Sequence, residues 1–134
     1  MISPEETIER LGIVLPKAPL PVANYVSIAW SGDILYLSGA GPAQRSDGSQ
    51  WVGKIGREFS VDEGYQAARS VGLVQISRLK DELGDLGRVK KIVKLLGMVN
   101  CTSEFTEHPA VINGCSDILV EVFSDAGKHA RSAV

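Results

Sequence analysis

Residues 60–83, SVDEGYQAARSVGLVQISRLKDEL, decide the fold, because they predict one long helix with a single apolar face. Ser60 and Glu63 form a capping box, in which each side chain bonds to a backbone amide at the helix start. Apolar residues then recur at steps of three and four, and Gly84 ends the pattern. Gly72 lies on this face, so we expect the helix to approach a sheet closely there. The face consists of Tyr65, Ala68, Gly72, Ile76, Leu79 and Leu83, whereas Arg69, Gln75 and Arg78 lie off it.

Segments on both sides of this helix predict β-strands. Two short apolar runs upstream are separated by Ser31-Gly32-Asp33, which is the pattern of a β-hairpin. Downstream, an almost continuous aliphatic run is typical of an interior strand that is covered on both faces. The predicted strands span residues 25–30, 34–38, 51–55, 89–99 and 130–134.

Two further helices complete the pattern. Residues 3–11 start with Ser3 as a candidate N-cap, Pro4 at the first helical position and Glu6 three residues after the cap. Residues 106–123 carry an apolar stripe with Pro109 in the first turn. Strands separated by two long helices indicate an α+β fold, with one mixed sheet and both long helices on one face.

One face of that sheet has no partner in the chain. Ile92, Leu96 and Met98 alternate onto the face that the helices leave open. Exposed apolar patches of this kind usually mark interfaces, so we expect a homo-oligomer built on the open face.

Composition excludes several classes of protein. The chain has 134 residues, 44% of them hydrophobic, which fits one domain. Its net charge of −2 and the lack of a basic stripe argue against a nucleic-acid partner. No apolar window is long enough to span a membrane, and the acidic start does not resemble a signal peptide, so we expect a cytoplasmic protein.

Few residues suggest chemistry. Cys101 and Cys115 have no metal-ligand spacing with His108 or His129, so we expect no metal. The two thiols are interpreted as structural in a reducing cytosol, with a catalytic thiol as the alternative. Asp117 and Glu121, four residues apart, are either paired carboxylates or, as helix-surface acids usually are, solvated. No nucleotide-binding, nucleophile-elbow or zinc-protease motif is present, and we expect no cofactor.

The segment 127–134, GKHARSAV, is the best candidate for binding. Arg131 comes at the start of a predicted strand, after a helix and a glycine turn, where its planar fork can hold a carboxylate. His129 and Lys128 add positive character. The alternative is that Arg131 pairs with a surface acid of the same chain.

The sequence resembles the Rid family (reactive intermediate deaminases, also called YjgF or L-PSP proteins) over nearly its whole length. Asn24-Tyr25-Val26 opens the first strand, and Ile34–Gly39 forms the second. Asn113 lies in the last helix, and residues 129–134, HARSAV, are close to the family signature A-R-S-x-V. The long N-terminal extension, residues 1–23, and the Ser-Gly-Ala-Gly-Pro form at 38–42 are more like a divergent subgroup.

The resemblance implies a single Rid/YjgF-like domain over residues 1–134, with a chorismate-mutase-like fold and a homotrimer with ligand clefts between subunits. It implies that Arg131 clamps the carboxylate of a 2-imino or enamine acid, which water then deaminates to a 2-oxoacid without metal or organic cofactor. Tyr25, Ser38, Gly39, Asn113 and Ser132 are the implied substrate-binding residues: Tyr25 from the neighbouring subunit, Ser38 and Gly39 in the wall, and Asn113 near the entrance.

Departures from the family pattern keep a second function open. Ala40 stands where the founding deaminases have a polar residue, and Ala133 stands where they have cysteine. The family's water-positioning glutamate would follow Val134, so we expect the chain to lack the final strands, about one hairpin. The alternative function is a trimer that binds a small carboxylate metabolite without turnover. The family's historical ribonuclease label finds little support in a chain without a basic patch.

Overall fold

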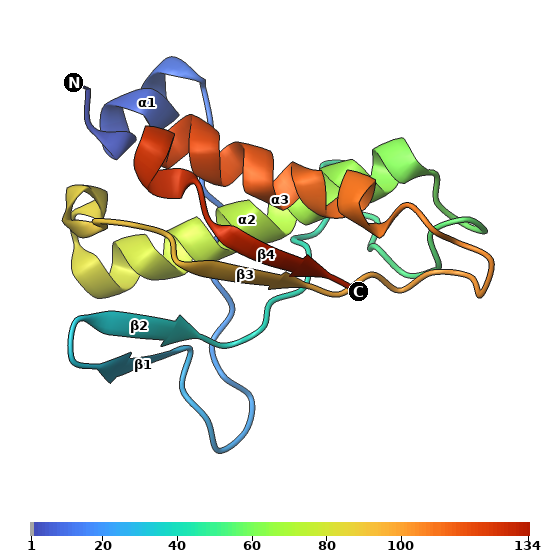
Figure 1. The fold of residues 1–134 in the computed structure, drawn as a ribbon, viewed down its shortest axis with the longest axis horizontal. Coiled ribbons are helices and arrows are strands. Elements are labelled where there is room, and N and C mark those ends of the chain that lie inside the picture. The colour runs from blue at the N-terminus through green and yellow to red at the C-terminus, as the bar shows by residue number, and fades with distance from the viewer. Residues whose placement is uncertain (1) are drawn as a thin grey trace.

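The computed structural model describes residues 2–134 and has the predicted α+β composition (Figure 1). Antiparallel and parallel strand pairs both occur, and two long helices pack side by side. The helices are α1 (Pro4–Arg10), α2 (Val61–Leu83) and α3 (His108–Phe123), with the 3-10 turns η1 (Leu86–Arg88) and η2 (Ser124–Gly127). The strands are β1 (Ile28–Ser31), β2 (Ile34–Leu37), β3 (Lys94–Gly97) and β4 (Ala130–Ala133).

Both predicted capping boxes are confirmed. The Ser60 hydroxyl accepts from the Glu63 amide, and the Glu63 carboxylate accepts from the Ser60 amide at the start of α2. Ser3 and Glu6 form the same reciprocal pair at the start of α1. Pro109 lies in the first turn of α3 as expected. Local side-chain chemistry therefore fixes where α1 and α2 begin.

The single mixed sheet predicted from the sequence is wrong. β1 and β2 pair as an antiparallel hairpin, and β3 and β4 pair in parallel, as two separate two-stranded sheets. Residues 51–55 form no strand, and only isolated bridges form at Ile55. Gly53 and Gly56, on either side of Ile55, have positive φ angles, which interrupt an extended strand. The run 89–99 is a strand only at its centre, since the Ile92 amide bonds to Ala126 of η2.

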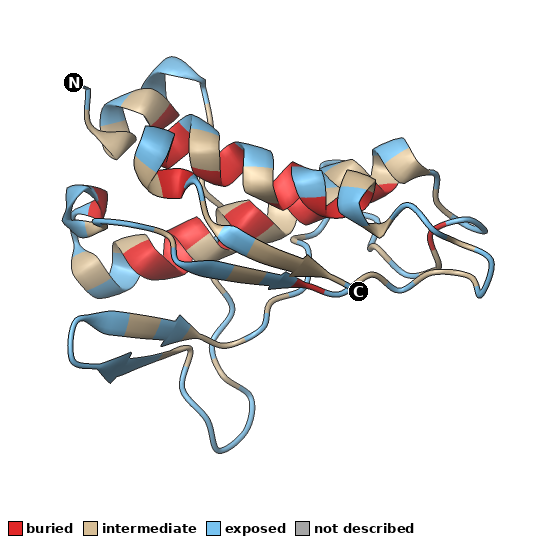
Figure 2. Ribbon diagram, viewed as in Figure 1, coloured by how far each residue is buried: buried red, intermediate tan, exposed pale blue. Residues whose placement is uncertain are grey.

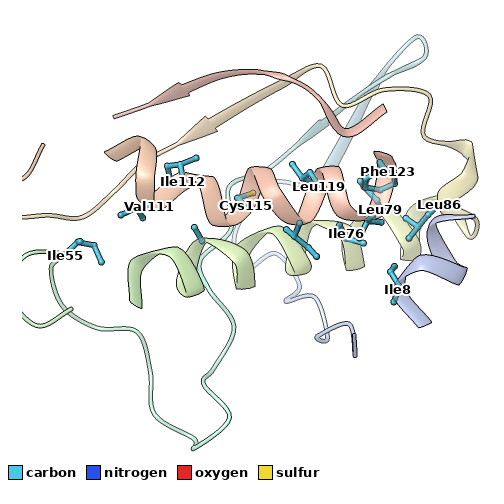
Figure 3. Close-up of a cluster of buried hydrophobic side chains, with 13 residues drawn as sticks. Ile8, Ile55, Ile76, Leu79, Leu86, Val111, Ile112, Cys115, Leu119 and Phe123 are labelled. Carbon is cyan, nitrogen blue, oxygen red and sulfur yellow. The ribbon is translucent and has the colours of Figure 1, made fainter. Parts of the chain in front are cut away.

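The core fills the seam between α2 and α3, where side chains from both helices interdigitate (Figure 3). Ile8 and Leu86 close one end of the seam, and Ile55 closes the other. Gly72 permits close packing as expected, but against α3 and not against a sheet: a Cβ there would lie 2.5 Å from Ile118 Cγ2. The burial pattern in Figure 2 accordingly follows the two long helices.

The strands are covered on one face only. Leu95 packs on the core, whereas Leu96 is 57% exposed and Met98 is 73% exposed. The interpretation of 89–99 as a strand covered on both faces is therefore wrong, whereas the expected exposure of Leu96 and Met98 on an open face is confirmed. Ile92 is an exception, because it packs against the core. Within residues 2–134, no helix is both long and apolar enough to cross a lipid bilayer.

Candidate functional site

Arg131 lies in β4 on the side that faces α3. Its main-chain partner across the ladder is Leu95, which packs on the core, so both side chains point toward the helix layer. Arg131 Nη1 donates to Asn113 Oδ1 at 2.8 Å and to Ser116 Oγ at 3.2 Å. Asn113 and Ser116 are three residues apart and therefore share one face of α3. The structure thus brings together two of the predicted site residues, Arg131 and Asn113.

A chain of hydrogen bonds continues from Arg131 to His129. His129 Nδ1 lies 2.6 Å from the Gly127 carbonyl oxygen, and Nε2 lies 2.9 Å from Ser116 Oγ. Because a carbonyl can only accept, Nδ1 carries a proton and donates to Gly127, while Nε2 shares a hydrogen bond with the Ser116 hydroxyl. Ser116 Oγ in turn accepts from Arg131. Ser116 Oγ therefore links Arg131 to His129, and the bonds to Asn113 and Ser116 hold the Nη1 end of the guanidinium against α3.

The other edge of the Arg131 guanidinium is open. Within residues 2–134, Nε and Nη2 donate to no protein acceptor, neither is among the fully buried unsatisfied atoms, and no carboxylate forms an ion pair with Arg131. The nearby Lys128 is already paired with Asp125 at 2.9 Å. A shallow hollow of about 260 Å³ lies here, lined by Ser116, Val120, Lys128, His129 and Arg131. The guanidinium therefore offers this hollow a positive charge with two adjacent free donors.

Tyr25, Ser38 and Gly39 form a second group. Ser38 Oγ donates to the Val26 carbonyl at 2.6 Å, which ties the end of β2 to the segment that carries Tyr25. Tyr25 is 49% exposed, and Gly39 is also exposed. The carbonyls of Ser38 and Gly39 point the other way, toward α2, where Arg78 Nη1 donates to both. No hydrogen bond in residues 2–134 connects this group with the Arg131 group.

Ser132 belongs to neither group. Successive strand residues face opposite sides, so the Ser132 side chain lies on the opposite face of β4 from Arg131. There its hydroxyl accepts from Lys94 Nζ at 2.7 Å.

The sequence did not identify Ser116 as a site residue, and it did not indicate that Arg78 is buried. The spacing of Asn113 and Ser116 on one helical face was the available signal for Ser116. Arg78 was placed off the apolar face of its helix, yet it is only 7% exposed. The contact that buries it comes from residues 38–39, about forty positions earlier, which no local pattern reveals.

The remaining polar candidates have structural partners. Tyr65 donates to Asp117 at 2.6 Å, which raises the pKa of the tyrosine, and Arg69 forms a two-point ion pair with Glu121. The paired-carboxylate interpretation of Asp117 and Glu121 is therefore wrong, because each carboxylate bonds to α2. Their bonds to Tyr65 and Arg69 also set them apart from freely solvated acids.

The two cysteines differ in their surroundings. Burial raises the pKa of the Cys115 thiol to about 11. Cys101 is partly exposed, and its sulfur lies 3.3 Å from His108 Nε2, a contact that the spacing of the two residues in the sequence did not indicate. In residues 2–134, no three side chains of the metal-binding types gather in a way that could hold an ion.

Comparison with known proteins gives consistent results. A sequence profile described as "YjgF/chorismate mutase-like, putative endoribonuclease" matches residues 5–134. Protein TCP17 from Trypanosoma cruzi is 44% identical over 128 residues, which cover 95% of this chain and 79% of that protein. The crystal structure of a "putative endoribonuclease" from Shewanella oneidensis MR-1 superimposes with a TM-score of 0.91 at 35% identity, covering 97% of this chain and 85% of that chain. A protein of unknown function from Agrobacterium tumefaciens gives a TM-score of 0.84 at 36% identity, covering 98% and 80%.

Proposed function

Because the chain belongs to the YjgF/chorismate-mutase-like family, we propose that it hydrolyses reactive 2-imino and enamine acids to 2-oxoacids. In this reaction, water adds to the imine carbon to give a carbinolamine, and the C–N bond then breaks to release ammonia and a carbonyl. An enamine first takes up a proton on carbon to become the imine. Such imines already hydrolyse in water, so positioning and modest charge stabilisation are what the protein has to supply.

The half-open guanidinium of Arg131 carries the proposal. Asn113 and Ser116 hold Nη1 from α3, while Nε and Nη2 remain available as a parallel pair of donors. That pair matches the two oxygens of a carboxylate, which charged, two-point hydrogen bonds bind strongly. Neutral partners also leave the charge of Arg131 uncompensated. The alternative raised from the sequence, an arginine already paired with an acid of its own chain, does not describe this geometry.

We propose that the working unit is a homotrimer, with each cleft lying between two subunits. The open strand face supports this assembly, because Leu96 and Met98 remain exposed on it. Separation of the Tyr25–Ser38–Gly39 group from the Arg131–Asn113 group supports it too, since a neighbouring subunit would complete the cleft with the missing half. Ser132, on the face opposite Arg131, would then contribute through the subunit interface.

An assay of imine loss tests the proposed reaction. 2-Iminopropanoate is generated in situ by an amino-acid oxidase, and its decay is followed with wild-type protein, Arg131→Ala and Arg57→Ala. Arg57 is a matched control, because it is exposed and paired with Glu58. We expect wild type and Arg57→Ala to accelerate the decay and Arg131→Ala to lose most of that acceleration. A wild-type rate equal to the spontaneous rate would exclude the deaminase.

A trimer that binds a carboxylate without turnover is the second candidate. One observation favours it: both ring nitrogens of His129 are engaged, so the groups nearest Arg131 include no unoccupied general base. This function predicts saturable binding of a 2-oxoacid that depends on Arg131, without ammonia release. The endoribonuclease description attached to the family and to the Shewanella relative is less suited to this chain, whose net charge is −2.

A further inference from the structure

Arg78 is a buried cation without an acidic partner. It lies on α2, it is 7% exposed, and no carboxylate in residues 2–134 forms an ion pair with it. Its Nε is enclosed and meets no acceptor. Arginine keeps its charge in proteins, and burial of an unpaired charge is costly, so the residue calls for an explanation beyond packing.

All the acceptors around Arg78 are neutral, and they lie at the end of β2. Nη1 donates to the Ser38 carbonyl at 3.0 Å, to the Gly39 carbonyl at 3.2 Å and to Gln75 Oε1 at 3.2 Å. Gln75 Nε2 also donates to the Ser38 carbonyl at 2.9 Å. The neutral Gln75 amide therefore already satisfies the Ser38 carbonyl oxygen, and Arg78 adds mainly a positive charge beside it.

The contact fixes the direction of two successive peptide groups. In a trans peptide the C=O and the following N–H point in opposite directions, and residues 2–134 contain no cis peptide. With both carbonyls turned toward α2, the amides of Gly39 and Ala40 point away from the helix. Neither amide donates a hydrogen bond to another group of residues 2–134. Successive outward amides backed by a cation make a surface that attracts anions.

Resting on the proposed function, we propose that Arg78 is a positioning residue that makes the Ser38–Gly39 wall of the cleft selective for anionic ligands. It holds the two carbonyls inward, and its charge acts on the ligand through the peptide groups that it polarises. Arg131 makes the direct contact with the carboxylate, whereas Arg78 makes the opposite wall favour the same sign of charge.

Binding of a charged ligand and its neutral analogue tests this role. The probes are 2-oxobutanoate and 2-oxobutanamide, titrated into wild type, Arg78→Gln, Arg78→Lys and Arg69→Gln by calorimetry. Arg69→Gln is the matched control, because Arg69 lies on the same helix and pairs with Glu121. The readout is the ratio of the two affinities, which a general loss of packing leaves unchanged.

We expect Arg78→Gln to reduce the preference for 2-oxobutanoate over the amide by roughly tenfold, through loss of one buried charge. Arg78→Lys keeps the charge and should stay within about threefold of wild type, as should Arg69→Gln. If Arg78→Gln does not fold, the lysine variant is titrated at pH 6, where a buried lysine keeps its proton more readily, and a collapse of its ratio there would overturn the charge argument. An unchanged ratio in Arg78→Gln would overturn the proposal as well.

The same titration separates this proposal from the function on which it rests. If wild type binds 2-oxobutanoate and Arg131→Ala does not, the carboxylate site stands, and an unchanged ratio in Arg78→Gln removes only the role of Arg78. If wild type fails to bind 2-oxobutanoate, the proposed function and the role of Arg78 are both excluded.

Discussion

The nitrogens of the Arg131 guanidinium have two different roles, one structural and one in ligand binding. Nη1 is consumed by Asn113 and Ser116, which fix the side chain without neutralising it. Nε and Nη2 remain for a ligand. A lysine at this position would keep the charge but could not divide its donors in this planar way.

Cysteine reactivity gives a prediction at the same scale. Because burial penalises the thiolate, the raised pKa of Cys115, about 11, keeps that side chain a neutral thiol near pH 8. Cys101 is partly exposed. We expect iodoacetamide at pH 8 to label Cys101 first, with Cys115 labelled only as the pH approaches 11 or when the protein unfolds. Peptide mapping by mass spectrometry measures both sites, and labelling of the two cysteines at similar rates at pH 8 would contradict the burial assignment.

Single-residue roles were only partly predictable from sequence. Arg131 was recognisable because its family signature is local, and Asn113 followed from the same resemblance. Arg78 and Ser116 depend on contacts between distant segments, so their surroundings became visible only in three dimensions. The partner of Cys101 was missed because spacing alone does not show that His108, at the start of α3, turns back onto the thiol.

At the scale of elements, the α2–α3 pair organises the molecule. The two helices approach very closely at Gly114, since a Cβ at this position would collide with the main-chain carbonyl oxygen of Tyr65 and approach the Arg69 amide. At Gly72 the nearest obstacle is a side chain, because an added Cβ would lie 2.5 Å from Ile118 Cγ2. Moving a buried side chain costs less than separating two helix backbones, so Gly114 should be less tolerant of an added Cβ than Gly72.

We predict that Gly114→Ala destabilises the fold by about 3 kcal/mol, because overpacking against a backbone forces the helices apart. Gly72→Ala should cost less, about 2 kcal/mol, since its relief requires the buried Ile118 side chain to shift and leaves the backbone in place. Gly41→Ala, with no atom within 4 Å of the added Cβ, should stay within about 0.5 kcal/mol of wild type. Urea denaturation followed by circular dichroism gives the three free energies of unfolding. Equal losses for Gly114→Ala and Gly72→Ala would contradict this account of the helix contact.

Helix starts were predictable because capping chemistry is local, and α1 and α2 begin where their capping boxes indicated. The strands were predicted too long. Strand ends depend on competing partners, and Ala126 captures the Ile92 amide while Arg78 and Gln75 capture the Ser38 carbonyl. The prediction of one sheet was wrong because periodicity identifies a strand but not the neighbour with which it pairs, and the strands form two separate pairs.

At the scale of the whole molecule, the open strand face sets the expected assembly. Leu96 and Met98 lie on the face turned away from the core, and Tyr36 is 63% exposed on β2. A charge buried in an apolar subunit contact is costly when it has no partner.

We therefore predict that Leu96→Glu converts a trimer into monomers and abolishes ligand binding, because each cleft needs residues from two subunits. Leu11→Glu, at an exposed position directly after α1, is the matched control and should remain trimeric. Sedimentation equilibrium measures the number of chains per particle. A monomeric wild type that binds a 2-oxoacid normally would contradict the proposed arrangement of the cleft.

The central claim is that the free edge of Arg131 holds a carboxylate, and a crystal structure with bound 2-oxobutanoate tests it most directly. We predict that the carboxylate oxygens accept from Arg131 Nε and Nη2, that Nη1 keeps its bonds to Asn113 and Ser116, and that Ser38 and Gly39 of a neighbouring subunit form the facing wall. An Arg131 edge without ligand in crystals that hold 2-oxobutanoate elsewhere, or a carboxylate bound away from Arg131, would contradict the claim.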